Sequence, residues 1–270
     1  MTASHWRACA AGTALLGLLV AGCGSSTGGT AAGATGAQPA GGTVSSAAAP
    51  SSAAAQPATG TAQCDFQKTP GQPAPSGKDE GVPPAGASRA GTVSVTLHTS
   101  AGDIPMTMPR SKAPCTVASF AFLAAKGYFS HSPCHRITDY PNPSPLFVLQ
   151  CGDPTGSGSG GPGYTIPDEN PTNLPSAPGG QGSVYARGTV AMANTGQPHS
   201  GGSQFFLVYR DSHLPPSYAV FGTVSAAGLA VLDKIQQAGI TPGTDPSTGQ
   251  ATPNDGKPKT PVTITTATVG

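Results

Sequence analysis

The chain has 270 residues, and its 13 Lys and Arg nearly balance its 12 Asp and Glu, which gives a formal net charge of +1. A protein that binds nucleic acid needs a basic stripe along its surface, so this balance argues against such a partner. Beyond the first residues, nothing in the sequence resembles a segment that spans a membrane.

The N-terminal end is predicted to be an export signal over residues 1–22. Arg7 precedes an apolar run, residues 8–20, that is too short to span a bilayer as a permanent helix. The run ends in Leu19-Val20-Ala21-Gly22-Cys23, which resembles a bacterial lipobox, where the cysteine becomes a lipidated N-terminus. Because two acyl chains suffice for stable anchoring, the pattern predicts a protein lipid-anchored through Cys23 to the extracytoplasmic face of the cell membrane. The alternative is an ordinary signal peptide with an incidental cysteine.

Residues 23–63 are predicted to form a disordered tether. No charged side chain occurs from Ala8 through Cys64, and Ala, Gly, Ser, Thr and Pro dominate the composition. Such a segment cannot bury enough apolar surface to offset its chain entropy. The Pro-rich arm that follows, residues 64–90, contains Phe66 and mixed charges, and we expect it to pack on one domain formed by residues 91–270.

Four cysteines remain once Cys9 and Cys23 are assigned to the predicted signal and lipid site, and an exported protein can form disulfides. They are Cys64, Cys115, Cys134 and Cys151, and they allow three full pairings. Cys134 and Cys151 flank an expected β-hairpin and could face each other across its strands. That pairing would leave Cys64 to tie the N-terminal arm to Cys115.

Alternating apolar and polar residues predict eight short strands in the domain. The first two, at residues 93–97 and 104–108, are expected to form a hairpin around a Gly102-Asp103 turn. The others are expected near residues 134–138, 147–151, 189–193, 204–209, 219–224 and 262–268. Helical spacing predicts one helix over residues 114–126 and a second near residues 226–238. This pattern is typical of a β-sandwich or a closed barrel.

Four short blocks stand in the order in which they occur in the cyclophilins, and the chain resembles that family over residues 92–268. The blocks are Cys134-His135-Arg136-Ile137, Phe147-Val148-Leu149-Gln150-Cys151-Gly152-Asp153, Ala191-Met192-Ala193-Asn194 and Gly201-Gly202-Ser203-Gln204-Phe205-Phe206-Leu207. The resemblance implies a mainly β fold, a closed eight-stranded antiparallel barrel capped by two α-helices. It also implies a monomeric peptidyl-prolyl cis/trans isomerase without a cofactor, acting on proline-containing unfolded or exported polypeptides.

The resemblance assigns the chemistry to Arg136, with Gln150 and Gln204 beside it. A guanidinium can attract the lone pair of the prolyl nitrogen as the amide twists, and this attraction is stronger in the twisted state than in either planar state. A neighbouring amide can orient the guanidinium or bind the substrate carbonyl.

The resemblance also implies a substrate site with an apolar slot for the proline ring and a strand that pairs with the peptide. Its members are Phe147, Val148, Ala193, Asn194, Phe206, His213, Leu214 and Tyr218. Taken singly, each aromatic is more typical of a core and each glutamine of a surface, so the prediction depends on the whole set.

The chain departs from the family pattern in several places. Nine residues, 138–146, separate Ile137 from Phe147 where common members have a tight turn, and this loop could reshape one wall of the pocket. His213 stands where many eukaryotic members have tryptophan, and Tyr218 replaces a histidine. Because the mature chain lacks tryptophan altogether, we do not expect it to bind cyclosporin tightly.

Two other patterns are weaker. Residues 156–161 fit the G-x-G-x-x-G dinucleotide motif, but prolines follow where a phosphate cradle requires a helix, which favours a flexible loop. His131, Cys134, His135 and Cys151 have no standard zinc-ligand spacing, so no metal site is predicted.

Two alternatives without turnover remain open, namely a chaperone or scaffold that binds proline-containing segments, and a wall-associated structural lipoprotein. An inserted loop that displaced Phe147 or covered Arg136 would favour the first. A pocket without peptide affinity would favour the second.

Overall fold

The structure is a computed structural model that describes residues 60–69, 79–180 and 182–270. The predicted signal peptide, the lipidation site Cys23 and the tether up to residue 59 lie outside the described residues. Within the described ranges, no helix is long and apolar enough to cross a membrane.

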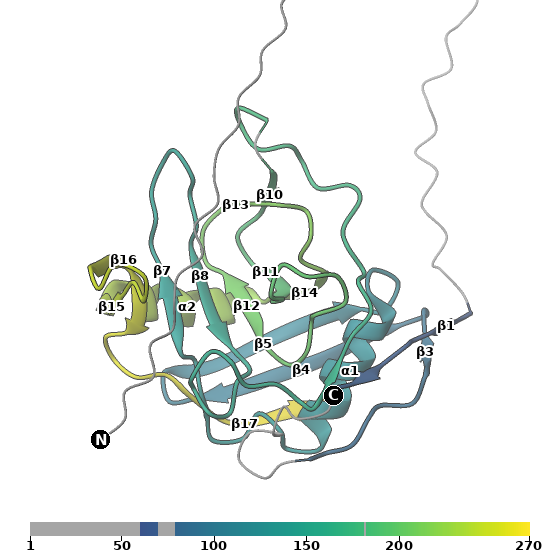
Figure 1. The fold of residues 1–270 in the computed structure, drawn as a ribbon. Coiled ribbons are helices and arrows are strands. Elements are labelled where there is room, and N and C mark those ends of the chain that lie inside the picture. Colours follow the sequence, from purple (N-terminus) through teal and green to yellow (C-terminus); the bar gives the residue numbers. More distant parts are fainter. Residues whose placement is uncertain (1–59, 70–78, 181) are drawn as a thin grey trace, which may run out of the picture. The chain divides into compact units, whose positions relative to one another are not determined.

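One antiparallel sheet of eleven strands forms the centre of the fold and is curled (Figure 1). The main apolar core is made by buried residues of these strands and of the two helices. In spatial order its strands are β15 (Ile240–Thr244), β16 (Ala251–Pro258), β7 (Arg136–Thr138), β8 (Val148–Cys151), β12 (Phe205–Val208), β11 (Thr189–Met192), β14 (Val220–Val224), β5 (Gly102–Pro109), β4 (Thr92–Thr99), β17 (Thr263–Val269) and β6 (Ser132–Pro133). The prediction of a mainly β fold is confirmed. The closed eight-stranded barrel is not, because the order of paired strands among the described residues is open, with β15 and β6 at its ends.

The hairpin of β4 and β5 shows why these residues form strands. Val93, Val95 and Leu97 alternate with polar residues and are buried, as are their partners in β5, which are two methionines and Ile104. The turn differs from the predicted Gly102-Asp103. Thr99 pairs with Gly102, so the turn consists of residues 100 and 101, and the Thr99 hydroxyl closes it by accepting from the Ala101 N–H.

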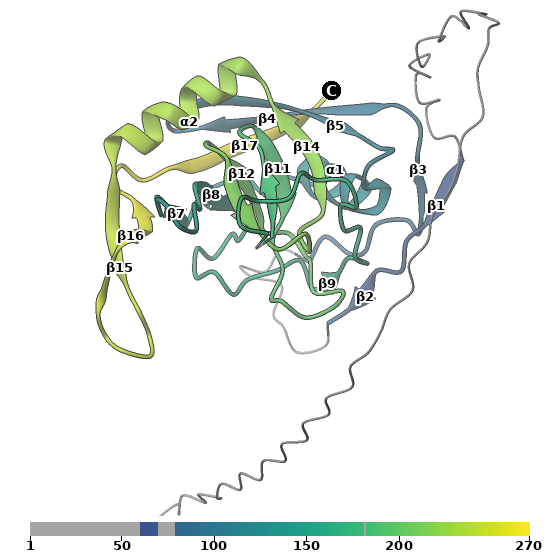
Figure 2. The ribbon, with the colours of Figure 1, turned by 90° about the horizontal axis from the view of Figure 1, so that it is seen from above.

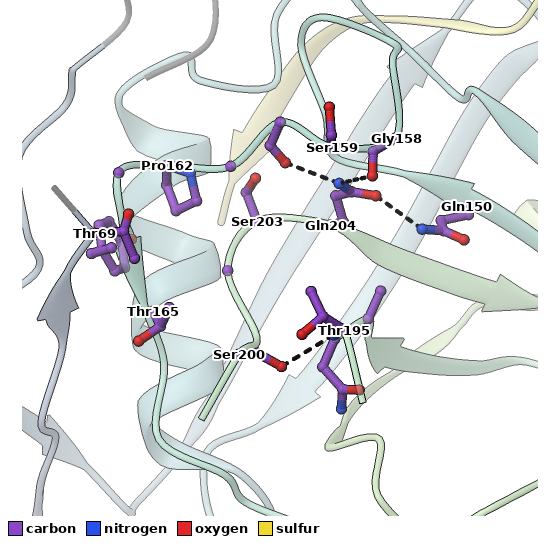
Figure 3. Close-up of a pocket in the computed structure, with 17 residues that line it drawn as sticks. Thr69, Gln150, Gly158, Ser159, Pro162, Thr165, Thr195, Ser200, Ser203 and Gln204 are labelled. Atoms are coloured by element: carbon purple, nitrogen blue, oxygen red, sulfur yellow. Dashed lines mark hydrogen bonds between the residues drawn. The ribbon is translucent and has the colours of Figure 1, made fainter. Parts of the chain in front are cut away.

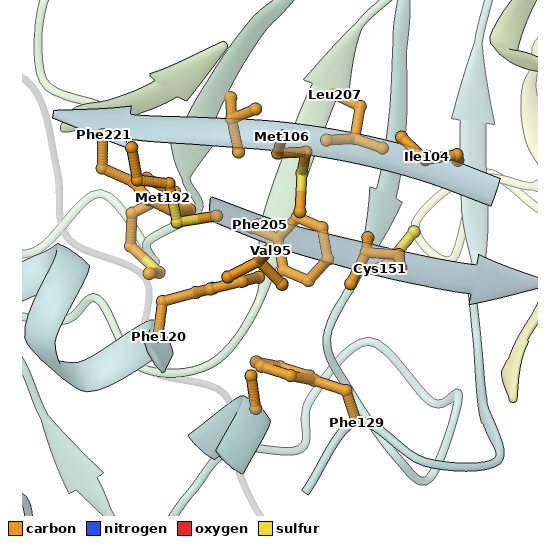
Figure 4. Packing of buried hydrophobic residues seen from close by; sticks show 14 of the residues in the cluster. Val95, Ile104, Met106, Phe120, Phe129, Cys151, Met192, Phe205, Leu207 and Phe221 are labelled. Carbon is orange, nitrogen blue, oxygen red and sulfur yellow. The ribbon is translucent and has the colours of Figure 1, made fainter. Parts of the chain in front are cut away.

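Both predicted helices are present, as α1 (Pro114–Ala125) and α2 (Ala226–Ala238). Pro114 opens α1, where a missing N–H costs nothing, and the Glu169 carboxylate accepts from the next two backbone N–H groups at 2.9 and 2.8 Å. The Ser225 side chain caps α2 by accepting from the Gly228 N–H. Helix α2 packs on β5, and Phe120 of α1 lies in the core against three other phenylalanines (Figure 4).

The sheet is buried on both faces where β7, β8, β11 and β12 run side by side, because successive side chains of a strand point to opposite faces. Along β12, Phe205 and Leu207 belong to the main core, whereas Phe206 and Val208 belong to a second cluster. This second cluster consists of Val148, Tyr185, Ala191, Phe206 and Val208. It gives the sheet an apolar surface on the side opposite the main core.

The N-terminal arm is joined to the domain by one short ladder and a disulfide, and a second ladder pairs the segments at its two ends. β1 (Thr61–Gln63) pairs with β3 (Gly86–Ser88), and β2 (Gln67–Lys68) pairs with β9 (Tyr164–Thr165). Between these ladders, Cys64 is bonded to Cys115 of α1, and the second disulfide joins Cys134 to Cys151. The structure therefore contains the two disulfides of the pairing that the hairpin argument favoured.

Several strands have no counterpart among the eight predicted ones. The largest are β15 and β16, which form a hairpin that extends away from the sheet beside β7 (Figure 2). A short ladder of β10 (Ser183–Tyr185) and β13 (Ser212–Leu214) lies beside the second cluster. Pro, Gly and Asn make up much of the hairpin, and these residues are typical of loops rather than strands.

Candidate active site

An apolar pocket of about 280 Å³ lies on the surface of the second cluster. It is lined by Arg136, Leu146, Val148, Gln150, Ala193, Asn194, Phe206, Leu214 and Tyr218. The structure thus brings eight of the predicted site residues together at one concave surface, although they come from five separate segments of the chain. Leu146 is the one lining residue that was not predicted.

Arg136 is placed at this pocket by the alternation of β7. Ile137 points into the main core and is 1% exposed, so its neighbour Arg136 must point to the opposite face. The guanidinium donates from Nε and Nη2 to the two carboxylate oxygens of Asp255, at 2.8 and 2.6 Å. The hydrogen bonds that Arg136 donates to Asp255 raise its pKa above its ordinary value, so the side chain is a permanent cation.

Gln150 connects this cation to the glycine-rich loop. It stands opposite Arg136 in the β7–β8 ladder, and its Oε1 accepts from Arg136 Nη1 at 3.2 Å. Its Nε2 donates to Gln204, whose own amide nitrogen donates to the carbonyls of Gly158 and Gly160, all at 2.9 Å (Figure 3). Gln204 is therefore linked to Arg136 through Gln150, and it also holds the glycine-rich loop.

The floor of the apolar pocket is aromatic and aliphatic. Phe206 and Tyr218 meet edge to face, with ring centroids 5.5 Å apart, and Val148 and Leu214 complete the floor. Tyr185 supports it from below, since its hydroxyl accepts from the Tyr218 N–H and hydrogen-bonds to the carbonyl of Pro215. Burial raises the pKa of Tyr185 to about 12, so this phenol stays neutral at physiological pH.

Ala193 and Asn194 form the rim of the pocket where β11 ends. The Ala193 N–H donates to the Gln204 carbonyl at 2.9 Å, which continues the β11–β12 ladder by one step. The Asn194 side chain donates to the Ser217 carbonyl and accepts from the Gly196 N–H, so it fixes the two loops on either side of it. The rim is therefore a short, rigid piece of backbone.

Two predicted substrate residues, Phe147 and His213, do not line the pocket. Leu146 and Val148 face it, and alternation turns Phe147 away, so that its ring lies 4.3 Å from the Arg210 guanidinium. For the same reason His213, which pairs with Val184, is directed away from the pocket that its neighbour Leu214 lines. Successive side chains within a strand point to opposite faces, and the sequence blocks alone did not include this constraint.

The inserted segment of residues 138–146 supplies Leu146. Tyr140 and Leu146 pair through two backbone hydrogen bonds of 3.1 and 3.0 Å, which extends the β7–β8 hairpin beyond the predicted strands. The Thr138 hydroxyl closes the base by donating to the Leu146 carbonyl. The expectation that this insertion reshapes one wall of the pocket agrees with the place of Leu146.

Asp255 is the second functional candidate that sequence reasoning missed. It lies 119 residues after Arg136, on a strand rich in Pro, Gly and Asn that gave no strand signal. Aspartates in loops are common, so no local sequence pattern could have identified Asp255 as a partner of Arg136. Only the pairing of β16 with β7 brings the two charges together.

A second pocket of about 350 Å³, here called the glycine-loop pocket, shares Gln150, Ala193 and Asn194 with the apolar pocket. The loop 158–163 and Gln204 form one wall together with Thr69 of the N-terminal arm, whose N–H donates to the Gly163 carbonyl, and Thr195 and Ser200 lie on the other side (Figure 3). The loop is built around Asp153. Burial by itself raises the pKa of Asp153, but hydrogen bonds from Thr155 and from the N–H groups of the loop outweigh it and lower the pKa.

The residues considered for zinc are not arranged for it. The sulfurs of Cys134 and Cys151 are bonded to each other, so neither is available as a thiolate ligand. Across the described part of the chain, no three His, Cys, Asp or Glu side chains are grouped as a metal site.

Comparison with known proteins adds to this geometry. Residues 94–269 match the model of the family described as cyclophilin type peptidyl-prolyl cis-trans isomerase/CLD. The chain is 46% identical over 201 residues to a probable peptidyl-prolyl cis-trans isomerase B of Mycobacterium tuberculosis, across 71% of this chain and 61% of that protein. It is 38% identical over 153 residues to a peptidyl-prolyl cis-trans isomerase of Helicobacter pylori, across 56% of this chain and 85% of that protein.

Among solved structures, a cyclophilin type peptidyl-prolyl cis-trans isomerase of Cryptosporidium parvum is 25% identical, with a TM-score of 0.46. The match covers 67% of this chain and 98% of that one. The family assignment depends on the sequence matches, which span the strands that carry the apolar pocket.

Proposed function

The chain belongs to the cyclophilin-type peptidyl-prolyl cis-trans isomerase family, and from this premise we propose that it accelerates cis/trans isomerisation of X-Pro bonds. The observation that carries the proposal is the meeting of a permanent cation, Arg136, with an apolar pocket in one concave site. The chain matches 61% of the length of its M. tuberculosis relative, so the activity of the whole protein is part of this proposal.

Arg136 acts on the barrier. Resonance between the prolyl nitrogen and the carbonyl creates a barrier of about 18 to 20 kcal/mol, and the resonance is lost when the amide is twisted. The nitrogen lone pair is then available, and a guanidinium directed at it stabilises the twisted state more than either planar state. The 38% exposure of the Arg136 side chain leaves it accessible to a bound peptide.

The apolar pocket holds the proline ring. Val148, Phe206 and Leu214 offer an apolar surface, and Tyr218 closes one side with its ring. The pocket fixes the proline ring of the substrate, while the segment before the proline can rotate about the X-Pro bond. Binding energy is then used to orient the prolyl nitrogen toward Arg136. This division of roles supports a site that binds and rotates an amide without covalent chemistry.

The substrates are proline-containing polypeptides in an extended form. Extended segments bring unpaired backbone groups, and the rim formed by Ala193 and Asn194 presents backbone at the edge of the pocket. No nucleotide or metal has a part in this chemistry, because the reaction only rotates a bond.

We further propose that the protein acts outside the cytoplasm as a monomer, held to the membrane by a lipid on Cys23. The lipobox pattern of residues 19–23 supports the anchor. Uncatalysed isomerisation of an X-Pro bond takes tens of seconds. A catalyst tethered to the outer face of the membrane would shorten this step for exported proteins as they fold. Labelling with a radioactive fatty acid should mark the full chain in its host and leave the Cys23→Ala variant unlabelled.

The activity is tested by NMR exchange spectroscopy on a short peptide with one X-Pro bond. We expect exchange cross-peaks between cis and trans forms at catalytic amounts of the full chain. A matched peptide with alanine in place of proline should show no binding to the apolar pocket. Absence of cross-peaks at all protein concentrations would contradict the proposal.

One observation favours a second function, a proline-segment-binding chaperone or scaffold without useful turnover. Phe147, next to the inserted loop, is turned away from the pocket, so the pocket lacks one of the aromatic side chains that the resemblance implied for the substrate site. The same NMR samples separate the two functions, because binding without faster exchange would support the chaperone and exclude the isomerase.

A further inference from the structure

We propose that Asp255 is a positioning residue for isomerisation, which holds the Arg136 guanidinium in the orientation that faces the twisted amide. The proposal rests on the function proposed for Arg136 and adds a residue from a different element, the β15–β16 hairpin. Its basis is the geometry of the pair and the local structure that places the carboxylate.

The pair fixes the guanidinium plane. Arg has five N–H donors in a rigid fork. Asp255 takes one from Nε and one from Nη2, and Gln150 takes one from Nη1. One N–H on each Nη is left, so the edge available to a peptide is determined by where Asp255 and Gln150 hold the other three.

The hairpin is built to place this carboxylate. Asp255 pairs with Thr138 and Gly256 with Ile137 of β7, so β16 is in register with the strand that carries Arg136. On its other side the ladder to β15 is interrupted, because Pro242 pairs with Gly256 but Gly243 pairs with Thr252. Residues 253–255 therefore form a bulge, and bulges are a common means of redirecting a side chain.

Close packing holds the bulge in place. A Cβ on Gly256 would lie 2.1 Å from the Thr241 carbonyl oxygen and 2.6 Å from the Gly243 nitrogen. The Thr252 hydroxyl donates to the Asp255 carbonyl at 2.7 Å, and the Asp139 N–H donates to the carbonyl of Asn254. The backbone on both sides of Asp255 is thus tied to β15 and to the inserted loop.

Asp255 acts by restricting the conformations of the Arg136 side chain and not by changing its charge. An arginine at a pocket rim samples many rotamers, and each must be given up before the guanidinium can act on the amide nitrogen. A partner that fixes the plane in advance removes this cost from the transition state. Arg136 keeps its full charge in the pair, since the hydrogen bonds to Asp255 strengthen its protonated form.

A second pair in the molecule offers a matched control. Arg187 donates from Nη1 and Nη2 to the two oxygens of Asp233, at 2.8 and 2.9 Å, and its side chain has the same 38% exposure as Arg136. Neither residue lines either pocket. Asp233→Asn therefore makes the same chemical change as Asp255→Asn at a place that should not affect turnover.

The test compares kcat/KM for an X-Pro peptide, by NMR exchange, in the full chain and its Asp255→Asn, Asp255→Glu, Asp233→Asn and Arg136→Ala variants. We expect Asp255→Asn to lower kcat/KM about tenfold through kcat, with peptide affinity within about twofold. Asp255→Glu should recover part of the loss, and Asp233→Asn should match the wild type.

Two further readouts separate positioning from a structural role. The Arg136 Nε–H NMR signal should be sharp in the wild type and exchange-broadened in Asp255→Asn. In the Arg136→Ala background, Asp255→Asn should cause no additional slowing. An equal slowing in both backgrounds would overturn the proposal, because the effect would then pass through the hairpin and not through Arg136.

The outcomes distinguish this proposal from the function on which it rests. If Arg136→Ala is slow but Asp255→Asn turns over like the wild type, Asp255 has no positioning role and the isomerase mechanism stands. If Arg136→Ala itself is as fast as the wild type, the proposed function of Arg136 fails first, whatever Asp255 does.

Discussion

At the scale of residues, strand alternation decides which side chains form the site. Arg136 and Gln150 face the apolar pocket because Ile137 and Leu149 point into the main core. The sequence blocks identified most of these residues by position. They also named Phe147, which alternation turns away, since a block of consecutive residues does not say which face each one takes.

His135 gives a prediction for the pH dependence of stability. Both ring nitrogens of His135 are buried, and burial lowers its pKa. As pH falls below about 6.5, the unfolded chain binds a proton at this histidine and the folded chain does not. The free energy of unfolding should therefore decrease from about pH 7 to pH 5, until the pH reaches the folded-state pKa.

The measurement is urea unfolding of the wild type and His135→Gln at several pH values in this range. The decrease should be smaller in the variant, because the group whose pKa differs between the two states has been removed. Equal decreases in both proteins would show that other groups cause the pH dependence.

Leu146 gives a prediction for substrate binding. Its side chain forms the wall of the apolar pocket that the inserted segment adds, and it has no role in orienting Arg136. Leu146→Ala should raise KM about threefold to tenfold, in line with the loss of a partial apolar contact, and leave kcat nearly unchanged. Steady-state kinetics on an X-Pro peptide checks this, and a loss confined to kcat would contradict it.

At the scale of elements, the helices and the strands with clear alternation could be predicted from the sequence. The bounds of α2 and most strands agree with the predicted positions because capping residues and period-two patterns are local signals. The β15–β16 hairpin could not be predicted. Its strand character comes from pairing with β7, and its composition favours a loop.

This hairpin gives a prediction of its own. Because a Cβ on Gly256 would meet the Thr241 carbonyl oxygen at 2.1 Å, Gly256→Ala must displace one strand from the other. We expect a loss of about 1 to 3 kcal/mol in the free energy of unfolding. We also expect kcat/KM to fall, since Asp255 is the next residue. Chemical denaturation and exchange kinetics measure both effects, and a variant with wild-type values of both would contradict the account of the bulge.

At the scale of the whole molecule, part of the curled sheet carries the main core on one face and the second cluster on the other. The apolar pocket lies where the second cluster is open to solvent. The family resemblance could predict this region because its blocks come from the strands concerned. It could not predict the open strand order, or that a distant carboxylate completes the site, because both depend on pairings between segments far apart in sequence.

The Cys64–Cys115 disulfide gives a prediction at this scale. It links residues 51 positions apart and ties the N-terminal arm to α1. The double variant Cys64→Ser, Cys115→Ser should lose about 2 to 4 kcal/mol of unfolding free energy, because the unfolded chain is no longer constrained. Thermal or urea unfolding checks the loss. Turnover of X-Pro peptides should persist, since neither cysteine lines the apolar pocket, and loss of turnover in the folded variant would contradict this separation.

The most direct measurement is cis/trans exchange of an X-Pro peptide with Arg136→Ala, compared with the wild type and with Arg187→Ala. The control removes an arginine side chain with the same exposed fraction, which is paired with another aspartate away from the pocket. The account predicts that exchange falls by at least about a hundredfold in Arg136→Ala, as expected when a preorganised electrostatic partner is lost, while Arg187→Ala keeps the wild-type rate. Equal rates for Arg136→Ala and the wild type would contradict the claim that this guanidinium stabilises the twisted amide.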